Sequence, residues 1–447
     1  YWQRAGEQAG TRPAYIEAET YFTKALTLLQ TLPETDKRLQ QTVHLQTRLA
    51  SVVMINKGVS APEFGEILSH AAELCQRLAD SVQLFFVLAG LRGYWGASGD
   101  ARRALVVAEQ MLQIAQQLRD PGMLLQAHMA LGICHYYPGR FPLAREHLQQ
   151  SIAFYDPQQH QSLTLLYGYD PAVLSLGYLS VLDWFLGYPE HALQKAQQGL
   201  TLARELGDPT NRILSLAFAG WSCLYRQELQ RASEYLLEVS RFSTEYGIPT
   251  FAGITTALQG YELIRRGDLE DGVEQIVQSL SQMASIRAEL YKSEFLAYQA
   301  EGHAALGRIE DGLAVLAQAL EVTERNDEHY YEAELYRLKG TLTLEARGWR
   351  LETSSPSPQA PSLKPLVSGE VLREAEGYFL KAIDIARQQQ AKSWELRAAT
   401  SLARLWQQQG KRAEAHTLLS EVYNWFTEGF DTKDLQEAKA LVEALRA

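Results

Sequence analysis

The chain has 447 residues, of which 46% are hydrophobic, the composition of a folded protein and not of a disordered one. Its net charge of -11 at pH 7 argues against nucleic-acid binding and against docking on an anionic membrane, since both call for a basic surface. No run of about 18 or more apolar residues lacks charges, so we predict no transmembrane helix.

The first residues are expected to belong to an incomplete repeat. The chain starts at Tyr1 within a helical pattern and shows no signal peptide, so we interpret it as part of a longer protein. Within residues 1–35, Pro13 to Leu32 fits one helix, with Ala18, Phe22 and Ala25 at packing positions. We therefore expect residues 1–35 to form a first, partial repeat.

Residues 36–347 carry a pattern that recurs every 40 residues or so. Its landmarks are turn residues, at Gly99, Gly139, Gly187, Gln227, Gly267 and Gly307, with a later one at Gly410. A small residue follows each turn by five positions, at Ala104, Ala144, Ala192, Ala232, Gly272, Gly312 and Ala415. Most turns also have a small residue seven positions earlier, at Gly132, Ser180, Gly220, Gly260, Ala300 and Ala403. Small residues at these places let the two helices of a hairpin approach closely, which is the tetratricopeptide layout.

Helix starts have their own signal in this region. Asp-Pro pairs at Asp120, Asp156, Asp170 and Asp208 place an N-cap acceptor before a proline suited to the first helical position. One interval between turns is longer than the others, and we assign the excess to an extra loop, Tyr155 to Asp170.

The C-terminal part interrupts the pattern once. Residues 348–369 contain a Pro- and Ser-rich stretch without periodicity, which predicts a flexible insertion. Residues 370–428 are expected to form the last repeats. Residues 431–447 predict an amphipathic helix that covers the apolar end of the array, as terminal repeats must. Residues 1–447 thus predict an all-α, right-handed superhelical solenoid of about ten tetratricopeptide-like hairpins.

Motifs of catalysis are missing from the sequence. It contains no GxxxxGK[ST], GxGxxG, HExxH or GxSxG. His128, Cys134 and His135 come nearest to a metal cluster, but their spacing puts them on different helical faces. We expect no enzyme activity, no cofactor and no metal. Cys75, Cys134 and Cys223 are isolated, which suggests reduced, buried or semi-buried thiols in a cytoplasmic protein.

The first helix of each hairpin should line the concave wall of the solenoid, and counting back from each turn predicts which side chains face its groove. They form an aromatic stripe ending in an arginine: Tyr136, Tyr137, Trp184, Phe185, Trp221, Tyr225, Tyr261 and Arg265. Arg404 and Gln408 are weaker candidates. Aromatic residues and arginine anchor partners more often than other types. The alternative is that the stripe is core between neighbouring repeats, and the sequence leaves both interpretations open.

Four segments carry a family resemblance: Tyr330–Gly340, Ala391–Ala399, Ser401–Arg412 and Trp425–Lys439. They resemble the C-terminal tetratricopeptide region of large bacterial signalling proteins with a STAND-type ATPase, often fused to a class III adenylate/guanylate cyclase. The resemblance implies a sensor or regulatory arm, whose nucleotide-binding residues would all lie upstream of this chain.

We therefore expect a non-catalytic arm that binds a protein partner, a peptide or small ligand, or its own upstream ATPase or effector module. Two alternatives stay open. The chain could be a free-standing scaffold that joins partner proteins, or a small-molecule enzyme whose groove holds a strongly perturbed titratable group. Neither a nucleic acid nor a membrane is an expected partner.

Overall fold

The computed structural model describes residues 2, 4–5, 15–160, 163–248, 252–351 and 368–446. Over these ranges all regular elements are helical and no strand occurs, which confirms the all-α prediction. Most of the predicted flexible insertion, residues 352–367, lies outside the described residues. Among the described helices, none combines the length and the apolar character that crossing a membrane would require.

Consecutive helices pack in pairs along most of the chain. The pairs are α3 (Asp36–Lys57) with α4 (Pro62–Arg77), α5 (Ser81–Ala97) with α6 (Ala101–Leu118), α7 (Pro121–Tyr136) with α8 (Phe141–Ala153), α11 (Pro171–Phe185) with α12 (Pro189–Leu206), α13 (Pro209–Tyr225) with α14 (Leu229–Tyr246), α15 (Ala252–Arg266) with α16 (Leu269–Ser285), α17 (Lys292–Ala305) with α18 (Ile309–Asn326), α19 (Glu332–Glu345) with α20 (Gly369–Gln389), and α21 (Lys392–Gln408) with α22 (Arg412–Tyr423). Helix α2 (Tyr15–Gln30) packs on α3, and α23 (Lys433–Arg446) packs on α21 and α22.

The predicted helix starts are present. The side chains of Asp120, Asp170 and Asp208 each accept a hydrogen bond from a backbone N–H in the first turn of the helix that follows, which also has proline at its start. The extra loop contains two short helices, α9 (Pro157–His160) and α10 (Leu163–Tyr167). Asp156 begins the first of them by accepting from the Gln158 N–H. These Asp-Pro pairs therefore act as helix caps.

All seven predicted turn residues have a left-handed backbone, including the single non-glycine among them, Gln227, with φ of 61°. Gln227 keeps this strained conformation while its side chain is held from two sides. Its Nε2 donates to Asp434 and its Oε1 accepts from Arg265. Its turn is thus fixed by contacts with residues far away in the chain.

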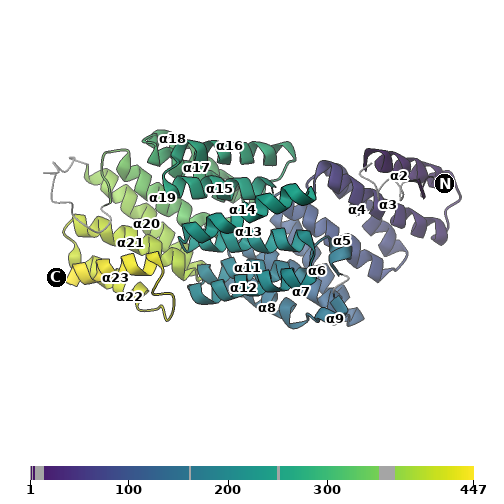
Figure 1. Cartoon of the computed structure of the whole chain (residues 1–447), viewed down its shortest axis with the longest axis horizontal. Coiled ribbons are helices and arrows are strands. Elements are labelled where there is room, and N and C mark those ends of the chain that lie inside the picture. Colours follow the sequence, from purple (N-terminus) through teal and green to yellow (C-terminus); the bar gives the residue numbers. More distant parts are fainter. Residues whose placement is uncertain are drawn as a thin grey trace.

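The superhelix turns back on itself, so that helices distant in sequence lie side by side (Figure 1). The C-terminal helices α21 to α23 lie beside α11 to α13, while α2 to α4 form the opposite end of the molecule. We call the contact zone between the turns of hairpins α3 to α14 and the connections within α16 to α23 the seam. It joins the first superhelical turn to the second.

Successive connections dock on successive hairpin turns along the seam. The Glu289 N–H donates to Ala97 O, and the Tyr330 N–H to Tyr137 O. The Ser393 hydroxyl donates to Trp184 O. The seam therefore keeps one register from α5 to α11.

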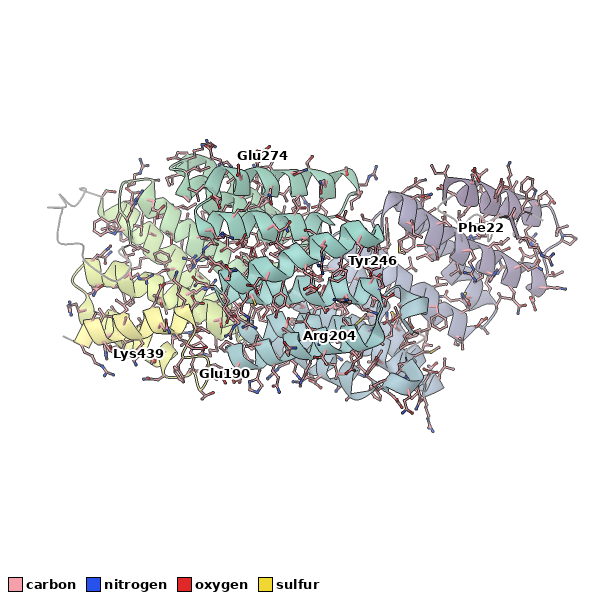
Figure 2. The ribbon with its side chains drawn as sticks, in the orientation of Figure 1. Phe22, Glu190, Arg204, Tyr246, Glu274 and Lys439 are labelled. Carbon is pink, nitrogen blue, oxygen red and sulfur yellow. The ribbon has the colours of Figure 1, made fainter. Side chains whose placement is uncertain are left out.

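The last part of the seam is a reciprocal lock between the α22–α23 connection and the start of α12. Figure 2 labels Glu190 at this border. The Glu428 carboxylate accepts from the backbone N–H groups of Glu190 and His191 and pairs with the His191 ring. Glu190 in turn accepts from the Gly429 N–H. Helix α12 has no cap from its own preceding residue, Tyr188, so a carboxylate more than 200 residues away satisfies its first N–H groups.

The seam predicts unequal costs for one substitution made at two turn glycines. Gly187 and Gly307 both have positive φ, so alanine is strained at either. A Cβ on Gly187 would lie 2.6 Å from Trp425 Cζ3 and 2.7 Å from Lys392 Cβ, whereas on Gly307 it would meet no described atom within 4 Å. We expect Gly307→Ala to cost about 1 kcal/mol and Gly187→Ala about 1–3 kcal/mol more. Urea denaturation midpoints of the two variants test this, and equal midpoints would contradict the seam.

Candidate functional site

The structure brings the predicted aromatic stripe together on the inside of the superhelix. Its members lie at the C-terminal ends of α7, α11, α13 and α15: Tyr136, Tyr137, Trp184, Phe185, Trp221, Tyr225 and Tyr261. All seven side chains belong to one buried cluster and are at most 6% exposed. The expected open groove is therefore filled in this conformation. That these residues bind a partner stays a prediction, and binding would need the interior to open.

The groove is filled because the second superhelical turn supplies a facing set of aromatic side chains: Tyr291, Phe295, Tyr298, Tyr330, Tyr331 and Trp394. Ring centroids of Trp184 and Trp394 lie 4.9 Å apart, and those of Tyr261 and Tyr298 lie 3.8 Å apart. Such contacts add to the free energy of burying the rings. We call the two sets together the aromatic core.

A carboxyl group, that of Glu294 on α17, stands at the centre of the aromatic core. Its Oε1 accepts from Trp221 Nε1 at 2.9 Å, from the Tyr225 hydroxyl at 2.5 Å and from the Tyr298 hydroxyl, and its Oε2 accepts from the Tyr330 hydroxyl at 2.6 Å. Burial raises the pKa of Glu294, and these four donors oppose the rise. One acidic side chain thus ties α13 of the first turn to α17 and the α18–α19 connection of the second.

Three tyrosine hydroxyls form a second polar group across the same interface. Tyr137 and Tyr291 lie 3.0 Å apart, and each is 2.6 Å from Tyr178. Burial raises the pKa of all three phenols. They therefore stay neutral and act by hydrogen bonding.

The remaining predicted residues are engaged at the edge of the core. Arg265 donates to the Tyr261 hydroxyl and to Gln227 Oε1. Arg404 pairs with Glu437 at 2.8 Å, and Gln408 accepts from Trp349 Nε1. Arg404 and Gln408 thus lie away from the aromatic core and hold the C-terminal helices together.

A second buried carboxyl group, that of Glu328, predicts a dependence of stability on pH. It is 3% exposed, and its Oε1 accepts from the Tyr291 N–H. Burial raises its pKa well above the usual range. As pH rises above the unfolded value of about 4.3, the unfolded chain loses this proton while the folded chain keeps it. Stability should therefore fall with rising pH in that window.

We expect Glu328→Gln to raise the stability at pH 8 by about 1–3 kcal/mol, at 1.36 kcal/mol per pKa unit, and the gain to shrink towards pH 5. Glu289 is the matched control. Burial acts to raise its pKa, but Lys292 and Arg325 outweigh burial and lower it. Glu289→Gln should lose stability, and the loss should fade as pH falls. Denaturation midpoints from pH 5 to 8 check both, and a pH-independent Glu328→Gln difference would contradict the argument.

A cleft of about 510 Å³ opens on the seam between α8, the α11–α12 turn and the α20–α21 connection. Arg145, Arg387 and Lys392 line it together with the rings of Tyr188 and Trp425. The three cations are largely spent on Asp183 and Glu395. The cleft therefore offers a mixed polar and aromatic lining without a strong net charge.

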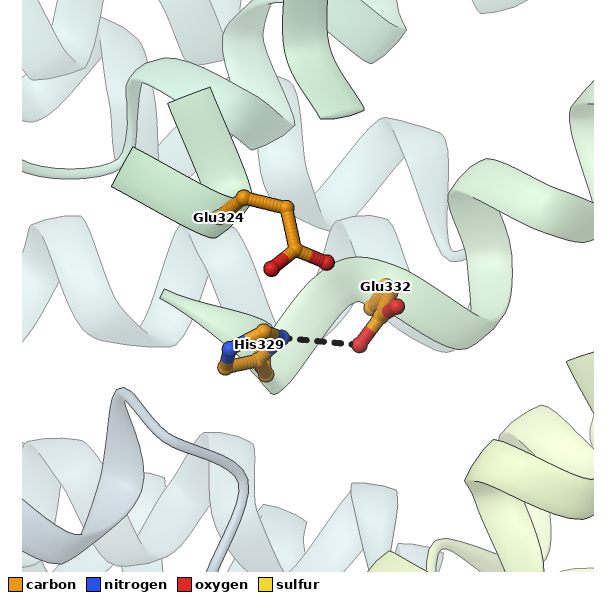
Figure 3. A group of neighbouring side chains, drawn as sticks. All are labelled: Glu324, His329 and Glu332. Atoms are coloured by element: carbon orange, nitrogen blue, oxygen red, sulfur yellow. Dashed lines mark hydrogen bonds and ion pairs between the residues drawn. The ribbon is translucent and has the colours of Figure 1, made fainter. Parts of the chain in front are cut away.

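The described residues hold one group with the side chains of a metal site, Glu324, His329 and Glu332, which face one another (Figure 3). They come from the end of α18, the 3-10 helix η1 (His329–Tyr331) and the start of α19. His329 Nδ1 lies 2.8 Å from Glu332, and this contact raises the pKa of His329. The contact explains the group without an ion, and we draw no metal site from it.

The histidines and cysteines noted in the sequence are arranged differently. The ring nitrogens of His128 and His147 lie 3.0 Å apart, and His135 stacks on His147. Cys134 belongs to another buried cluster. Cys75, Cys134 and Cys223 are free and buried, as expected.

Sequence reasoning missed Glu294, Tyr178 and Trp394. Glu294 is one of 53 acidic residues, and nothing in its neighbours marks it. A polar residue at an inward position of α17, where the pattern of the other hairpins calls for an apolar one, was the available signal. Its four donors could not be read from the chain because they come from three different elements.

No protein-family model matches the chain. An uncharacterized protein of Rhizobium meliloti is 22% identical over 348 residues, which are 76% of this chain and 33% of that protein. The chain thus spans about a third of the length of that relative.

Among solved structures, a Rap protein complexed with competence and sporulation factor aligns with a TM-score of 0.55, covering 92% of this chain and 99% of that one at 9% identity. The fold is a tetratricopeptide-like solenoid. At such identity the likeness concerns the fold alone. A STAND ATPase with a tetratricopeptide-repeat sensor from Pyrococcus horikoshii covers 91% of this chain and 54% of that one at 14% identity. Its TM-score of 0.43 is too low to support an argument.

Proposed function

We propose that this chain is a non-catalytic regulatory arm that binds a protein or peptide partner inside its superhelix. The observation that carries the proposal is that the predicted aromatic stripe gathers into one core, and that this core is closed by a seam of mainly polar contacts. Polar contacts at a partly exposed seam are individually weak. The seam is thus the part of the structure that opens at the smallest cost, and the aromatic core behind it is what a partner would gain.

The partner must prefer the open arm, because a ligand shifts an equilibrium only by its difference in affinity for the two states. The predicted contact residues are Tyr136, Tyr137, Trp184, Phe185, Trp221, Tyr225, Tyr261 and Arg265. The Rap protein was solved with a regulatory factor bound, which supports a binding role for a solenoid of this kind. Opening of the seam would change the distance between the ends of the arm and so signal binding.

We further propose that the arm controls an ATPase or cyclase effector in a bacterial cytoplasmic signalling protein. The support is the resemblance of the C-terminal segments to the repeat region of STAND-type proteins, and the greater length of the Rhizobium meliloti relative. In the resting state the closed arm would hold the effector inactive, and partner binding would release it.

The test uses the full chain as bait in a pull-down with mass spectrometry of the captured proteins. Three baits are compared: the wild type, the seam variant Glu190→Ala/Glu428→Ala, and Glu437→Ala, which breaks an ion pair within the C-terminal helices. A partner that needs the open arm should bind the seam variant about 3–30-fold more tightly, since the closed state reduces the apparent affinity. The Glu437→Ala bait should bind like the wild type. Equal capture by all three baits would contradict binding inside the arm.

A further inference from the structure

A small cavity lies in the seam, between the two superhelical turns. The α5–α6 turn and α7 form one wall, with Arg92 and Cys134 among the lining residues. The connections after α16 and α18 form the other, with Glu289 and Glu328. Its free volume of about 20 Å³ exceeds what one water molecule needs. The cavity can therefore receive a group of a few atoms while the arm stays closed.

Arg92 lines this cavity as a cation without a counter-charge. Its Nε is enclosed and has no hydrogen-bond partner, and the side chain makes no ion pair with any residue in the described ranges. A guanidinium stays charged in proteins. Its neighbours do not neutralise it, because burial raises the pKa of the Cys134 thiol to about 11 and that of the Tyr137 phenol well above its usual range.

The opposite wall holds an unused carboxyl group. Glu328 Oε2 has no hydrogen-bond partner among the described residues, although its Oε1 accepts from Tyr291. Glu289 lines the cavity as well, but its carboxylate is met by Lys292 and Arg325. An unpaired charge buried in a protein costs several kcal/mol unless something else compensates it. The cavity thus presents a donor fork and a carboxyl group, both without partners.

We propose that this cavity binds the carboxylate group of a ligand, with the Arg92 guanidinium donating to its oxygens. Arginine matches the planar shape of a carboxylate and can donate two parallel hydrogen bonds to it. Glu328, which keeps its proton because burial raises its pKa, can donate to the same group. The carboxylate comes either from a small organic acid or from the C-terminus of a peptide. Since it would touch both walls of the seam, it favours the closed arm. This inference does not depend on the proposed binding to the aromatic core.

The test is a thermal melt of the full chain in sodium acetate and in sodium chloride of equal ionic strength. Acetate should raise the melting temperature by about 2 °C at 100 mM, through preferential binding to the folded state, and chloride should not. Arg92→Met should abolish the acetate shift. Arg102→Met, which removes an exposed arginine of α6, should keep it. Arg92→Lys keeps the charge without the fork and should show a reduced shift, so the result does not depend on one variant folding.

A short peptide with a free C-terminus, compared with its amidated form, separates the two sources of the carboxylate. A shift with the free peptide and a smaller one with acetate assigns the site to a peptide terminus. A shift with acetate and none with the peptide assigns it to a small acid. An acetate shift that persists in Arg92→Met, or the absence of any shift with acetate and peptide in the wild type, overturns the proposal. These results leave the pull-down with the seam variant independent.

Discussion

Glu294→Ala is expected to lower the free energy of unfolding by about 3–5 kcal/mol. The alanine would leave Trp221 Nε1 and the hydroxyls of Tyr225, Tyr298 and Tyr330 without their acceptor inside the aromatic core. Each buried donor without a partner costs about 1–3 kcal/mol. The loss is limited by rotation of the tyrosine hydroxyls towards one another and by water entering the space. The shift of the urea denaturation midpoint measures the effect.

Two controls accompany this variant. Glu294→Gln keeps one acceptor oxygen and nearly the same volume, so it should lose less than Glu294→Ala. Glu270→Ala breaks an exposed ion pair with Arg308 and should change stability by less than about 1 kcal/mol. If Glu294→Ala proved no more costly than Glu270→Ala, the central carboxyl group would not hold the two superhelical turns together.

Gly260→Leu is the second variant with a large expected effect, of about 3 kcal/mol or more, at the upper end of overpacking costs. A Cβ on Gly260 would lie 2.7 Å from the backbone oxygen of Gly272 and 2.8 Å from Ile276 Cγ1. The backbone of α16 cannot move away without separating α15 and α16. We expect a clearly lower melting temperature.

Gly377→Leu is the matched control, since Gly377 lies on an exposed face of α20 and a Cβ there would meet no described atom within 4 Å. Replacing a helical glycine removes its propensity cost of about 1 kcal/mol, so this variant should be neutral or slightly more stable. A Gly260→Leu protein that melts like the wild type would show that the hairpin contact is assigned to the wrong residues.

The two variants examine different levels of the structure. Gly260 acts within one hairpin, whereas Glu294 acts between hairpins that lie far apart in the chain. If the arm opens on binding its partner, the hairpins should persist while the seam and the aromatic core separate. A partner would then protect the α13 and α15 helix ends from hydrogen exchange only after the seam contacts of Glu428 and Ser393 have broken.

The sequence alone was sufficient for the hairpins. Gly260 and Gly272 are 12 residues apart and meet because one short turn joins α15 to α16, so small residues at fixed distances from each turn reveal the contact. The Asp-Pro helix starts could be predicted for the same reason, since an N-cap acts on the residues that directly follow it. The inward position of the aromatic stripe also followed from counting along one helix.

Only the tertiary structure decided that the stripe is buried. The Ser393–Trp184 contact spans 209 residues and the Glu190–Glu428 contact spans 238. Whether two superhelical turns touch depends on the small rotation between neighbouring hairpins, summed over many of them. That rotation results from side-chain packing and leaves no periodic trace in the sequence. The same aromatic residues would line an open groove at one value of the rotation and form the core around Glu294 at another.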